Sequence, residues 1–249
     1  MAEQNGSPDI VLEAVNLWKS YGPVQALQGF SMAVPRGAFY GFFGRNGAGK
    51  TTTLDCVTGL LGRDRGRIRL FGEEVGLEPS PQVKQRFAYV GGNLNLYDWL
   101  TLDEHLDFIA GFYPSWDPAR CEELKGLFRL PMTQSAGSLS PGQHLQFQLL
   151  MALARNPELL LIDEPGNLDP VVRRRLMATM ADLLDKRQST IVMASHLIDE
   201  LEGLCDHMCI IDQGVALAAG SLEELGAAGY EAGQVGLQDF FIALTAERE

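Results

Sequence analysis

The apolar residues of this chain follow two patterns, and each pattern predicts a kind of β-strand. In residues 10–18 and 24–34, apolar and polar positions roughly alternate, which is typical of strands that bury one face. Other runs are apolar almost throughout, which favours strands buried on both faces of a sheet. Buried strands are predicted at 39–43, 87–90, 159–162 and 191–194, and shorter strands at 67–71, 208–212 and 215–218.

Segments with apolar residues at helical spacing lie between these strands. Leu54, Val57 and Leu61 predict a helix that ends near Gly59 and Gly62. Further helices are predicted from Ser140 to about Arg155, over 171–186, from Ser221 and over 237–245. Strands that alternate with helices indicate an α/β domain.

Residues 94–138 interrupt this alternation. The stretch is rich in aromatic residues, leucine and carboxylates, and helices are predicted near Thr101 and Pro118. Thr101 followed by Glu104 fits a capping box. We therefore expect an inserted helical subdomain. The core would consist of 10–93 and 139–249, after a disordered lead at 1–9.

The sequence GRNGAGKTTT follows the apolar run at 39–43 and fits the phosphate-loop pattern G-x-x-x-x-G-K-[ST]. Glycines in such a loop let backbone N–H groups face an anion, and the helix that follows adds its own unpaired N–H groups. Lys50 is expected to reach the outer phosphates of a nucleotide, and the Thr51 hydroxyl to hold Mg2+. A glycine-rich turn that binds nothing is the alternative, but the flanking strand and helix favour nucleotide binding. The residues expected to contact nucleotide are Gly44, Arg45, Asn46, Gly47, Ala48, Gly49, Lys50, Thr51 and Thr52.

Two carboxylates end the apolar run at 159–162. Parallel strands bring their carboxyl ends to the sheet edge where ligands of α/β folds bind, so Asp163 and Glu164 are expected beside the phosphate loop. Asp163 would hold Mg2+, and Glu164 would polarise the attacking water. An acidic turn before Pro165 is the alternative interpretation. His196, at the end of another strand, is a candidate γ-phosphate contact, although a histidine at a strand end is usually structural.

The sequence LSPGQ at 139–143 predicts the start of a helix. Ser140 suits the N-cap, Pro141 suits the first helical position, and Gln143 completes a capping box. The Ser140 hydroxyl and the Gly142 N–H could also face a phosphate. On the sequence alone, a plain capped helix is favoured over an anion site.

Two further features have more than one interpretation. Tyr21 lies at a turn, where its ring could stack on an adenine base or simply pack against the protein. Cys205, His207 and Cys209 could suggest a metal site. A strand entering the core is favoured because a fourth ligand is not evident.

The composition is that of a folded domain without a large basic surface. Hydrophobic residues make up 46% of the 249 residues and charged residues 21%, which argues against a disordered chain. The net charge of -12 argues against nucleic acid as a partner. The longest apolar runs are far shorter than the about 20 residues that a membrane-spanning helix needs, and the N-terminus lacks the features of a signal peptide. We therefore expect a cytoplasmic protein, and any pore it serves would belong to another chain.

The order of GRNGAGKTTT, LSPGQ, LLLIDEP, NLDP and SH resembles that of the nucleotide-binding subunits of ATP-binding cassette (ABC) transporters, from about Ile10 to Thr245. FYPSWD at 112–117 makes the resemblance closest to bacterial ABC-2-type exporter ATPases. The resemblance implies an α/β fold: a P-loop NTPase core with a mostly parallel central sheet, an N-terminal antiparallel β subdomain and an inserted α-helical subdomain. It also implies ATP and Mg2+ as cofactors. The implied partners are a second copy or a homologous ATPase subunit, and a membrane permease.

The resemblance implies a role for each matching residue. Glu164, His196 and Lys50 would be catalytic, as the general base, the switch histidine and a phosphate contact. Thr51 and Asp163 would bind Mg2+. The nucleotide would further be contacted by Tyr21 at the base, by Asp169 from a loop that communicates across a dimer, and by Ser140, Gly142 and Gln143 of the second copy.

Three positions depart from the family pattern. Pro141 stands where the family has Gly, but at the first helical position the lost N–H is expendable, so activity is expected to survive. Gly92 stands where the family has Gln, and Asn93 follows it. The run between Glu164 and the LDP sequence is one residue shorter, which affects the position of Asp169. The last two departures bear on coupling to a membrane partner.

We expect an ATPase subunit that dimerises on ATP, hydrolyses it and drives a separate permease at the inner face of the cell membrane, with export as the favoured direction. The altered stretches 91–93 and 165–168 motivate an alternative, a nucleotide-gated dimerisation module with little turnover. A DNA-repair or chromosome-associated ATPase is disfavoured, because the sequence has neither heptads nor a strong basic stretch.

Overall fold

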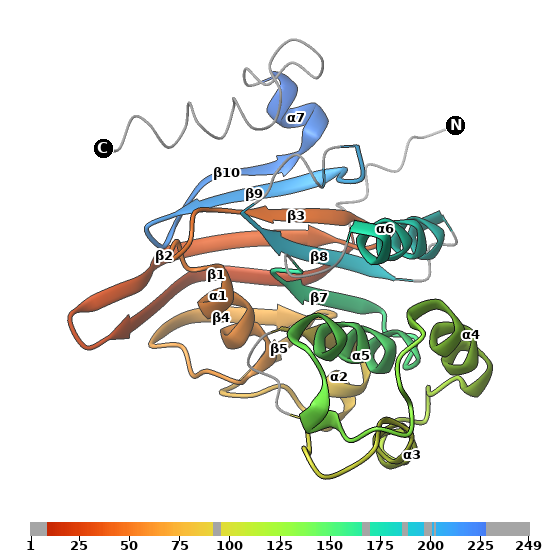
Figure 1. Cartoon of the computed structure of the whole chain (residues 1–249). Helices are drawn as coiled ribbons and strands as arrows, with labels where there is room; N and C mark the ends of the chain where they lie inside the picture. The colour runs from red at the N-terminus through yellow and green to blue at the C-terminus, as the bar shows by residue number, and fades with distance from the viewer. Residues whose placement is uncertain are drawn as a thin grey trace.

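The computed structural model describes residues 9–91, 96–165, 170–185, 189–196, 201 and 203–227. The larger of its two sheets contains β3 (Phe39–Phe43), β6 (Phe87–Val90), β7 (Leu159–Asp163), β8 (Thr190–Ser195), β9 (His207–Asp212) and β10 (Val215–Ser221). Their order across the sheet is β10-β9-β3-β8-β7-β6 (Figure 1). All neighbours are parallel except β9 and β10. The predicted mostly parallel central sheet is therefore confirmed.

The smaller sheet is antiparallel and lies near the N-terminus. It contains β1 (Ile10–Tyr21), β2 (Val24–Pro35), β4 (Arg65–Leu70) and the short β5 (Glu73–Val75), in the order β2-β1-β4-β5. The predicted N-terminal antiparallel subdomain is confirmed. The strand β5 was not predicted, because its three residues include two exposed glutamates and so show no apolar run.

The wholly apolar strands divide their side chains between two cores. In β3, Phe39 and Phe43 pack with Leu160 and Ile162 of β7 in one apolar cluster, while Tyr40 and Phe42 belong to a second cluster. Successive side chains of a strand point to opposite faces, so a strand buried on both sides must be apolar at every position. This is why the predicted buried strands lack the alternation seen in β1 and β2.

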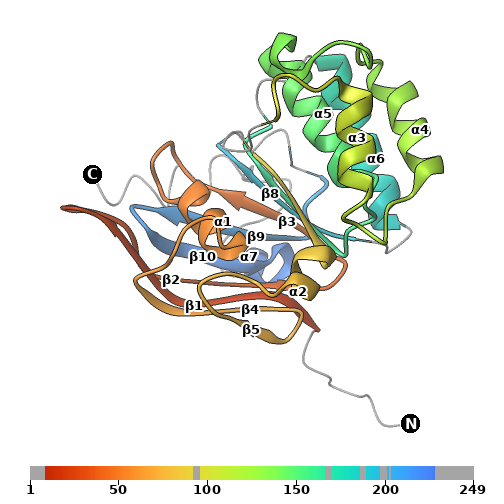
Figure 2. The ribbon, with the colours of Figure 1, turned by 90° about the horizontal axis from the view of Figure 1, so that it is seen from below.

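Helices cover both faces of the larger sheet (Figure 2). One face carries α1 (Lys50–Thr58), which packs between the two sheets through Leu54 and Val57. The other carries α5 (Pro141–Leu153) and α6 (Pro170–Asp185). Two further short helices outside the insertion are α2 (Pro81–Arg86) and α7 (Leu222–Ala227). The helix α2 was not predicted, although Ser80 caps it and Pro81 occupies its first position.

The predicted inserted helices are present as α3 (Leu102–Ala110) and α4 (Pro118–Phe128), followed by a short 3-10 turn, η1 (Ala136–Ser138). Thr101 and Glu104 form the predicted capping box, because each side chain accepts a hydrogen bond from the backbone of the other. Leu106 of α3 and Leu124 of α4 join the same apolar cluster as α5 and the larger sheet. The insertion is thus packed onto the core, and its exact limits at 94–138 stay a prediction.

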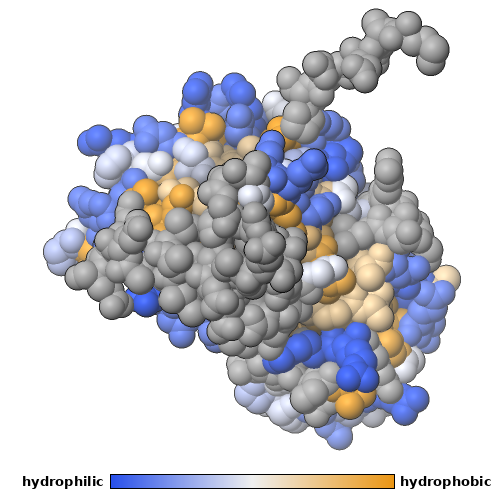
Figure 3. Space-filling view, turned by 90° about the horizontal axis from the view of Figure 1, so that it is seen from above, coloured by the Kyte–Doolittle hydropathy of each residue, from blue (hydrophilic) through white to orange (hydrophobic). Residues whose placement is uncertain are grey.

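Hydrophilic residues cover much of the described surface in the view from above, with smaller apolar patches among them (Figure 3). None of the described helices is long and apolar enough to cross a membrane. The four cysteines are free and buried. Among the described residues, no group of three or more His, Cys, Asp or Glu side chains could hold a metal ion. The predicted helix at 237–245 lies outside the described residues.

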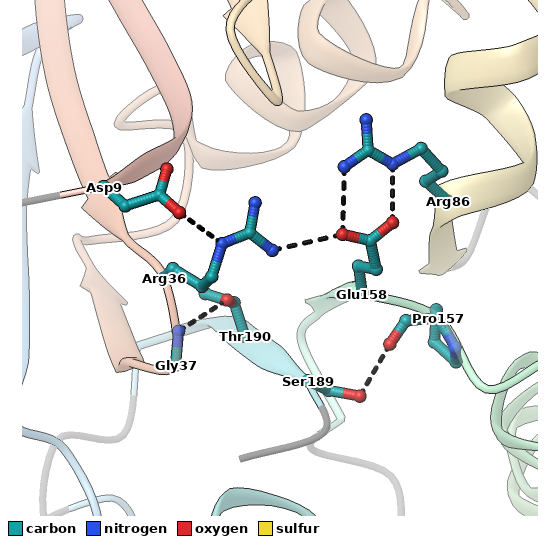
Figure 4. Close-up of polar contacts among 8 residues, drawn as sticks. All are labelled: Asp9, Arg36, Gly37, Arg86, Pro157, Glu158, Ser189 and Thr190. Carbon is teal, nitrogen blue, oxygen red and sulfur yellow. Dashed lines mark hydrogen bonds and ion pairs between the residues drawn. The ribbon is translucent and has the colours of Figure 1, made fainter.

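A row of alternating charges joins the two sheets at the amino ends of the parallel strands (Figure 4). The Glu158 carboxylate, just before β7, accepts two hydrogen bonds from Arg86 of α2, at 2.5 and 2.9 Å, and a third from Arg36 at 3.1 Å. Arg36 also pairs with Asp9 at 2.6 Å. Bidentate arginine–carboxylate pairs fix geometry as well as charge. The cluster therefore fastens the start of β7 to the small sheet and to α2.

Replacing Glu158 by Gln is expected to lower the free energy of unfolding by about 1 kcal/mol at pH 7, because the pairs are partly exposed and screened. Arg86, and then Arg36, hold the pKa of Glu158 below its ordinary 4.5. The stabilisation of the wild type is therefore present above that pH and is lost as the pH falls below it. In urea unfolding, the free energies of unfolding of the wild type and the Glu158→Gln variant should differ less at pH 4 than at pH 7. Glu123→Gln is the control, because it removes only a helix-surface pair with Arg120. Its expected loss of unfolding free energy is about 0.3 kcal/mol. Equal losses in both variants would contradict the role of the Glu158 cluster in joining the two sheets.

Candidate functional site

The carboxyl ends of four parallel strands meet at one edge of the larger sheet. The phosphate loop follows β3, Gly91 follows β6, Glu164 follows β7 and His196 follows β8. The register pairs Phe43 with Ser195 and places the end of β7 beside β8. The fold thus brings together the loop, the acidic pair and the histidine that the sequence analysis singled out.

The phosphate loop forms an open cradle in front of α1. Gly47 and Gly49 have φ of 81° and 115°, in the left-handed region that glycine adopts without strain. A Cβ on Gly49 would also meet the Ala26 carbonyl oxygen at 2.7 Å. No side chain caps the first turn of α1, so its N–H groups remain available to an anion. The cradle encloses about 240 Å³, lined by Ala26, Asn46, Gly47, Gly49, Lys50, Thr51, Thr52 and Glu164.

Lys50 is the buried cation at the centre of this cradle, with 4% of its surface exposed. Its ammonium donates to the carbonyl oxygens of Gly44 at 2.7 Å and Arg45 at 3.2 Å, and it lies 3.0 Å from Oε1 of Glu164. The loop is braced from outside, because the Gly214 N–H donates to the Ala48 carbonyl at 2.8 Å. A buried ammonium needs such acceptors, so the loop is built around the lysine.

Glu164 lies between Lys50 and His196. The same Oε1 atom that pairs with Lys50 is 3.6 Å from Nδ1 of His196, which is too long for a direct hydrogen bond. The backbone of Glu164 has a φ of 48°, an uncommon conformation for a residue with a side chain. Its N–H donates to the Ala194 carbonyl at 3.0 Å, which fixes this turn against β8. Lys50, Glu164 and His196 therefore converge as predicted, while their catalytic roles stay predictions.

Asp163, next to Glu164 of this cradle, has the features of a metal ligand. The residue is 7% exposed, and burial raises the pKa of its carboxyl, although the Thr51 hydroxyl opposes this rise by hydrogen bonding. Its Oδ1 atom is buried and has no hydrogen-bond partner among the residues that the structure describes. Mg2+ prefers oxygen ligands. The Thr51 hydroxyl and the unpartnered Oδ1 of Asp163 therefore fit the predicted Mg2+ site.

The LSPGQ sequence starts α5 as predicted. The Gln143 N–H donates to the Ser140 hydroxyl at 3.3 Å, and the Ser140 N–H donates to Oε1 of Gln143 at 3.0 Å, which completes the capping box. Neither residue, nor Gly142, lines the phosphate cradle of its own chain. A separate cavity of about 370 Å³ lies between α5 and the acidic pair, lined by Gly91, Leu139, Pro141, His144, Leu145, Gln148, Asp163 and Glu164.

Tyr21 ends β1 and is 49% exposed. The Lys19 ammonium lies 5.7 Å from the centre of its ring. Tyr21 does not line the phosphate cradle, but Ala26, on the strand that follows its turn, does. The role of Tyr21 in base stacking stays a prediction. Asp169, Gly92 and Asn93 lie outside the described residues.

Sequence reasoning missed three residues at this edge. Ala26 lines the cradle without belonging to any motif. Gln148 of α5 accepts a hydrogen bond from the Gly91 N–H at 3.2 Å. Tyr89 of β6 places its hydroxyl 3.5 Å from Oδ2 of Asp163. Tyr89 could have been identified from the sequence, because it carries a hydroxyl group near the carboxyl end of a buried strand.

Comparisons with known proteins agree with this geometry. Residues 27–167 match the family model for the ABC transporter. The chain is 30% identical to the ABC transporter ATP-binding protein YtrB of Bacillus subtilis (strain 168), covering 86% of this chain and 73% of that protein. It is 33% identical to the linearmycin resistance ATP-binding protein LnrL of the same organism, covering 86% and 70%. A solved structure titled as the ATP-binding subunit of an ABC transporter is 29% identical, with a TM-score of 0.84, covering 94% of this chain and 99% of that one. This chain belongs to the ATP-binding subunits of the ABC transporter family.

Proposed function

We propose that this chain hydrolyses ATP and that hydrolysis drives transport through a separate membrane permease. One observation carries the proposal: Lys50 and Glu164 line the same phosphate cradle, and Oε1 of Glu164 lies 3.0 Å from the lysine ammonium and 3.6 Å from Nδ1 of His196. A cation for the phosphates, a carboxylate that can accept a proton and a third polar group are the parts that phosphoryl transfer to water requires.

Each residue has a distinct task in this proposal. Lys50 exchanges Glu164 for the outer phosphates of ATP, and the glutamate then accepts a proton from the attacking water. His196 contacts the γ-phosphate from the end of β8. Asp163 and Thr51 hold Mg2+, which would neutralise phosphate charge when bound. Backbone N–H groups from Gly47 to Thr52 surround the phosphates, and Tyr21 stacks on the base.

We further propose that the nucleotide site is completed by a second copy of the chain or by a homologous subunit. Support comes from the position of the LSPGQ sequence, because Ser140, Gly142 and Gln143 do not line the cradle of their own chain. No side chain caps the first turn of α1, so its N–H groups remain available to a phosphate. An exposed helix N-terminus such as that of α5 is suited to meet phosphates on that side. Asp169 would then carry signals between the two sites.

The permease is proposed to bind an aromatic patch on the insertion, formed by Tyr97, Trp99, Phe108 and Phe112. Neighbouring rings lie 5.0–5.8 Å apart, and all four side chains are exposed, Trp99 at 75%. Carboxylates occupy the same stretch, at Asp98, Asp103, Glu104 and Asp107. Cytoplasmic loops of membrane proteins are rich in Lys and Arg. A basic loop with apolar side chains would match this surface in charge and in polarity, and would hold the chain at the inner face of the membrane.

We propose export as the direction of transport. Support comes from one relative, whose name assigns it a role in linearmycin resistance. Removing a toxic compound requires outward movement. The alternative is a nucleotide-gated module with little turnover. The Glu164–Lys50 ion pair supports this alternative, because the pair must open before Glu164 can act as the base.

Glu164→Gln is expected to lower ATP turnover about 100-fold or more, because general bases contribute factors of about 10² to 10⁴. ATP affinity should stay within about threefold, since the amide keeps the size of the side chain. Phosphate release and fluorescent-nucleotide titration measure the two quantities. Glu158→Gln, at the opposite sheet edge, is the matched control and should turn over normally. Wild-type turnover by the Glu164 variant would remove that residue from the role of base.

Trp99→Ala combined with Phe112→Ala is expected to reduce recovery of the chain with its permease about tenfold, because these are the two most exposed rings of the patch. Cell membranes containing the tagged chain would be solubilised, and the multi-span protein that co-purifies would be identified by mass spectrometry. ATP affinity should be unchanged. Leu77→Ala, at another exposed apolar residue, serves as the control. Full recovery of the same multi-span protein by the double variant would contradict the assigned surface.

A further inference from the structure

Tyr89 connects the predicted Mg2+ site to two other elements of the fold. The side chain extends from β6 and is 9% exposed. Its hydroxyl lies 3.3 Å from Oδ1 of Asp55 and 3.5 Å from Oδ2 of Asp163. Asp55 lies on α1, one helical turn beyond Thr51. The phenol therefore lies between α1, which starts at the phosphate cradle, and β7, which ends beside it.

The backbone leaves just enough room for this hydroxyl. A Cβ on Gly91 would lie 2.5 Å from the Tyr89 oxygen and 2.7 Å from the ring carbon that bears it. The Gly91 N–H is directed elsewhere, to Oε1 of Gln148 on α5 at 3.2 Å. Gly91 is consequently fixed from two sides, and any side chain at that position would displace the tyrosine.

The Tyr89 hydroxyl lies between two acceptor groups. A neutral phenol has a single proton to donate, and both of its carboxylate neighbours are acceptors. The hydroxyl therefore lies between two carboxylates, somewhat closer to Asp55 than to Asp163.

The two oxygens of Asp163 differ in this arrangement. Oδ2 faces the Tyr89 hydroxyl, whereas Oδ1 has no hydrogen-bond partner among the described residues. A carboxylate held by one oxygen presents the other in a fixed direction. Groups that orient a metal ligand in this way contribute to metal affinity without touching the metal.

We propose that Tyr89 is a positioning residue for the Mg2+ site: held by Asp55 and packed against Gly91, its hydroxyl orients Asp163 so that Oδ1 is presented to the metal ion. The proposal rests on the proposed function only in that Asp163 binds the metal. It adds Tyr89 and Asp55 to the residues that determine metal affinity. It also assigns a reason for glycine at position 91.

The test is the affinity for Mn2+ in the presence of ADP, measured by electron paramagnetic resonance of the free ion, which requires no turnover. Tyr89→Phe removes only the hydroxyl and is expected to weaken Mn2+ binding about tenfold, the lower end of the range for groups that orient metal ligands. ADP affinity in EDTA should change less than about twofold. Asp55→Asn should weaken Mn2+ binding as well, by a smaller factor.

Tyr40→Phe is the matched control. Tyr40 is also a buried tyrosine of the larger sheet, but its hydroxyl has no partner among the described residues. This variant should bind Mn2+ as the wild type does, and thermal unfolding would report any general loss of stability. Unchanged Mn2+ affinity in Tyr89→Phe would overturn the proposal, as would an equal loss in Tyr40→Phe. A wild-type chain that binds no Mn2+ with ADP would instead contradict the metal site of the proposed function.

Discussion

The burial of one ammonium group constrains the whole nucleotide-binding edge. Lys50 is almost fully enclosed and therefore needs acceptors on several sides. Two come from the carbonyl groups of its own loop, and the third is the carboxylate of Glu164. To place these acceptors around Lys50, β3 and β7 must end at the same edge of the sheet. The parallel pairing of β3, β8 and β7 ensures this. In the proposed function, a phosphate of ATP would replace the carboxylate of Glu164 beside Lys50.

The predictable parts of the structure are those in which a local pattern has one physical solution. A strand buried on both faces must be apolar throughout, so β3, β7 and β8 were evident from sequence. The capping boxes at Thr101 and Ser140 were equally evident, because each requires two specific side chains at a fixed spacing. The convergence of Lys50, Glu164 and His196 followed from parallel pairing alone.

The parts that could not be predicted depend on contacts between distant segments. Ala26 carries no chemical signal and reaches the cradle only because β2 passes beside the loop. Tyr89 was predicted only as part of a strand, since its neighbours Asp55 and Asp163 are remote in sequence. The short β5 and α2 lack a long apolar pattern. The charge cluster around Glu158 likewise joins residues from four separate segments.

One chain is proposed to supply half of each nucleotide site. The sedimentation velocity of the Glu164→Gln variant with Mg2+ and ATP is the decisive measurement, because blocked hydrolysis would preserve the ATP-bound state. The sedimenting mass is expected to double with Mg2+ and ATP, and Ser140→Arg in the same background should prevent doubling without abolishing ATP binding. A variant that binds ATP fully yet sediments as a single chain would contradict it.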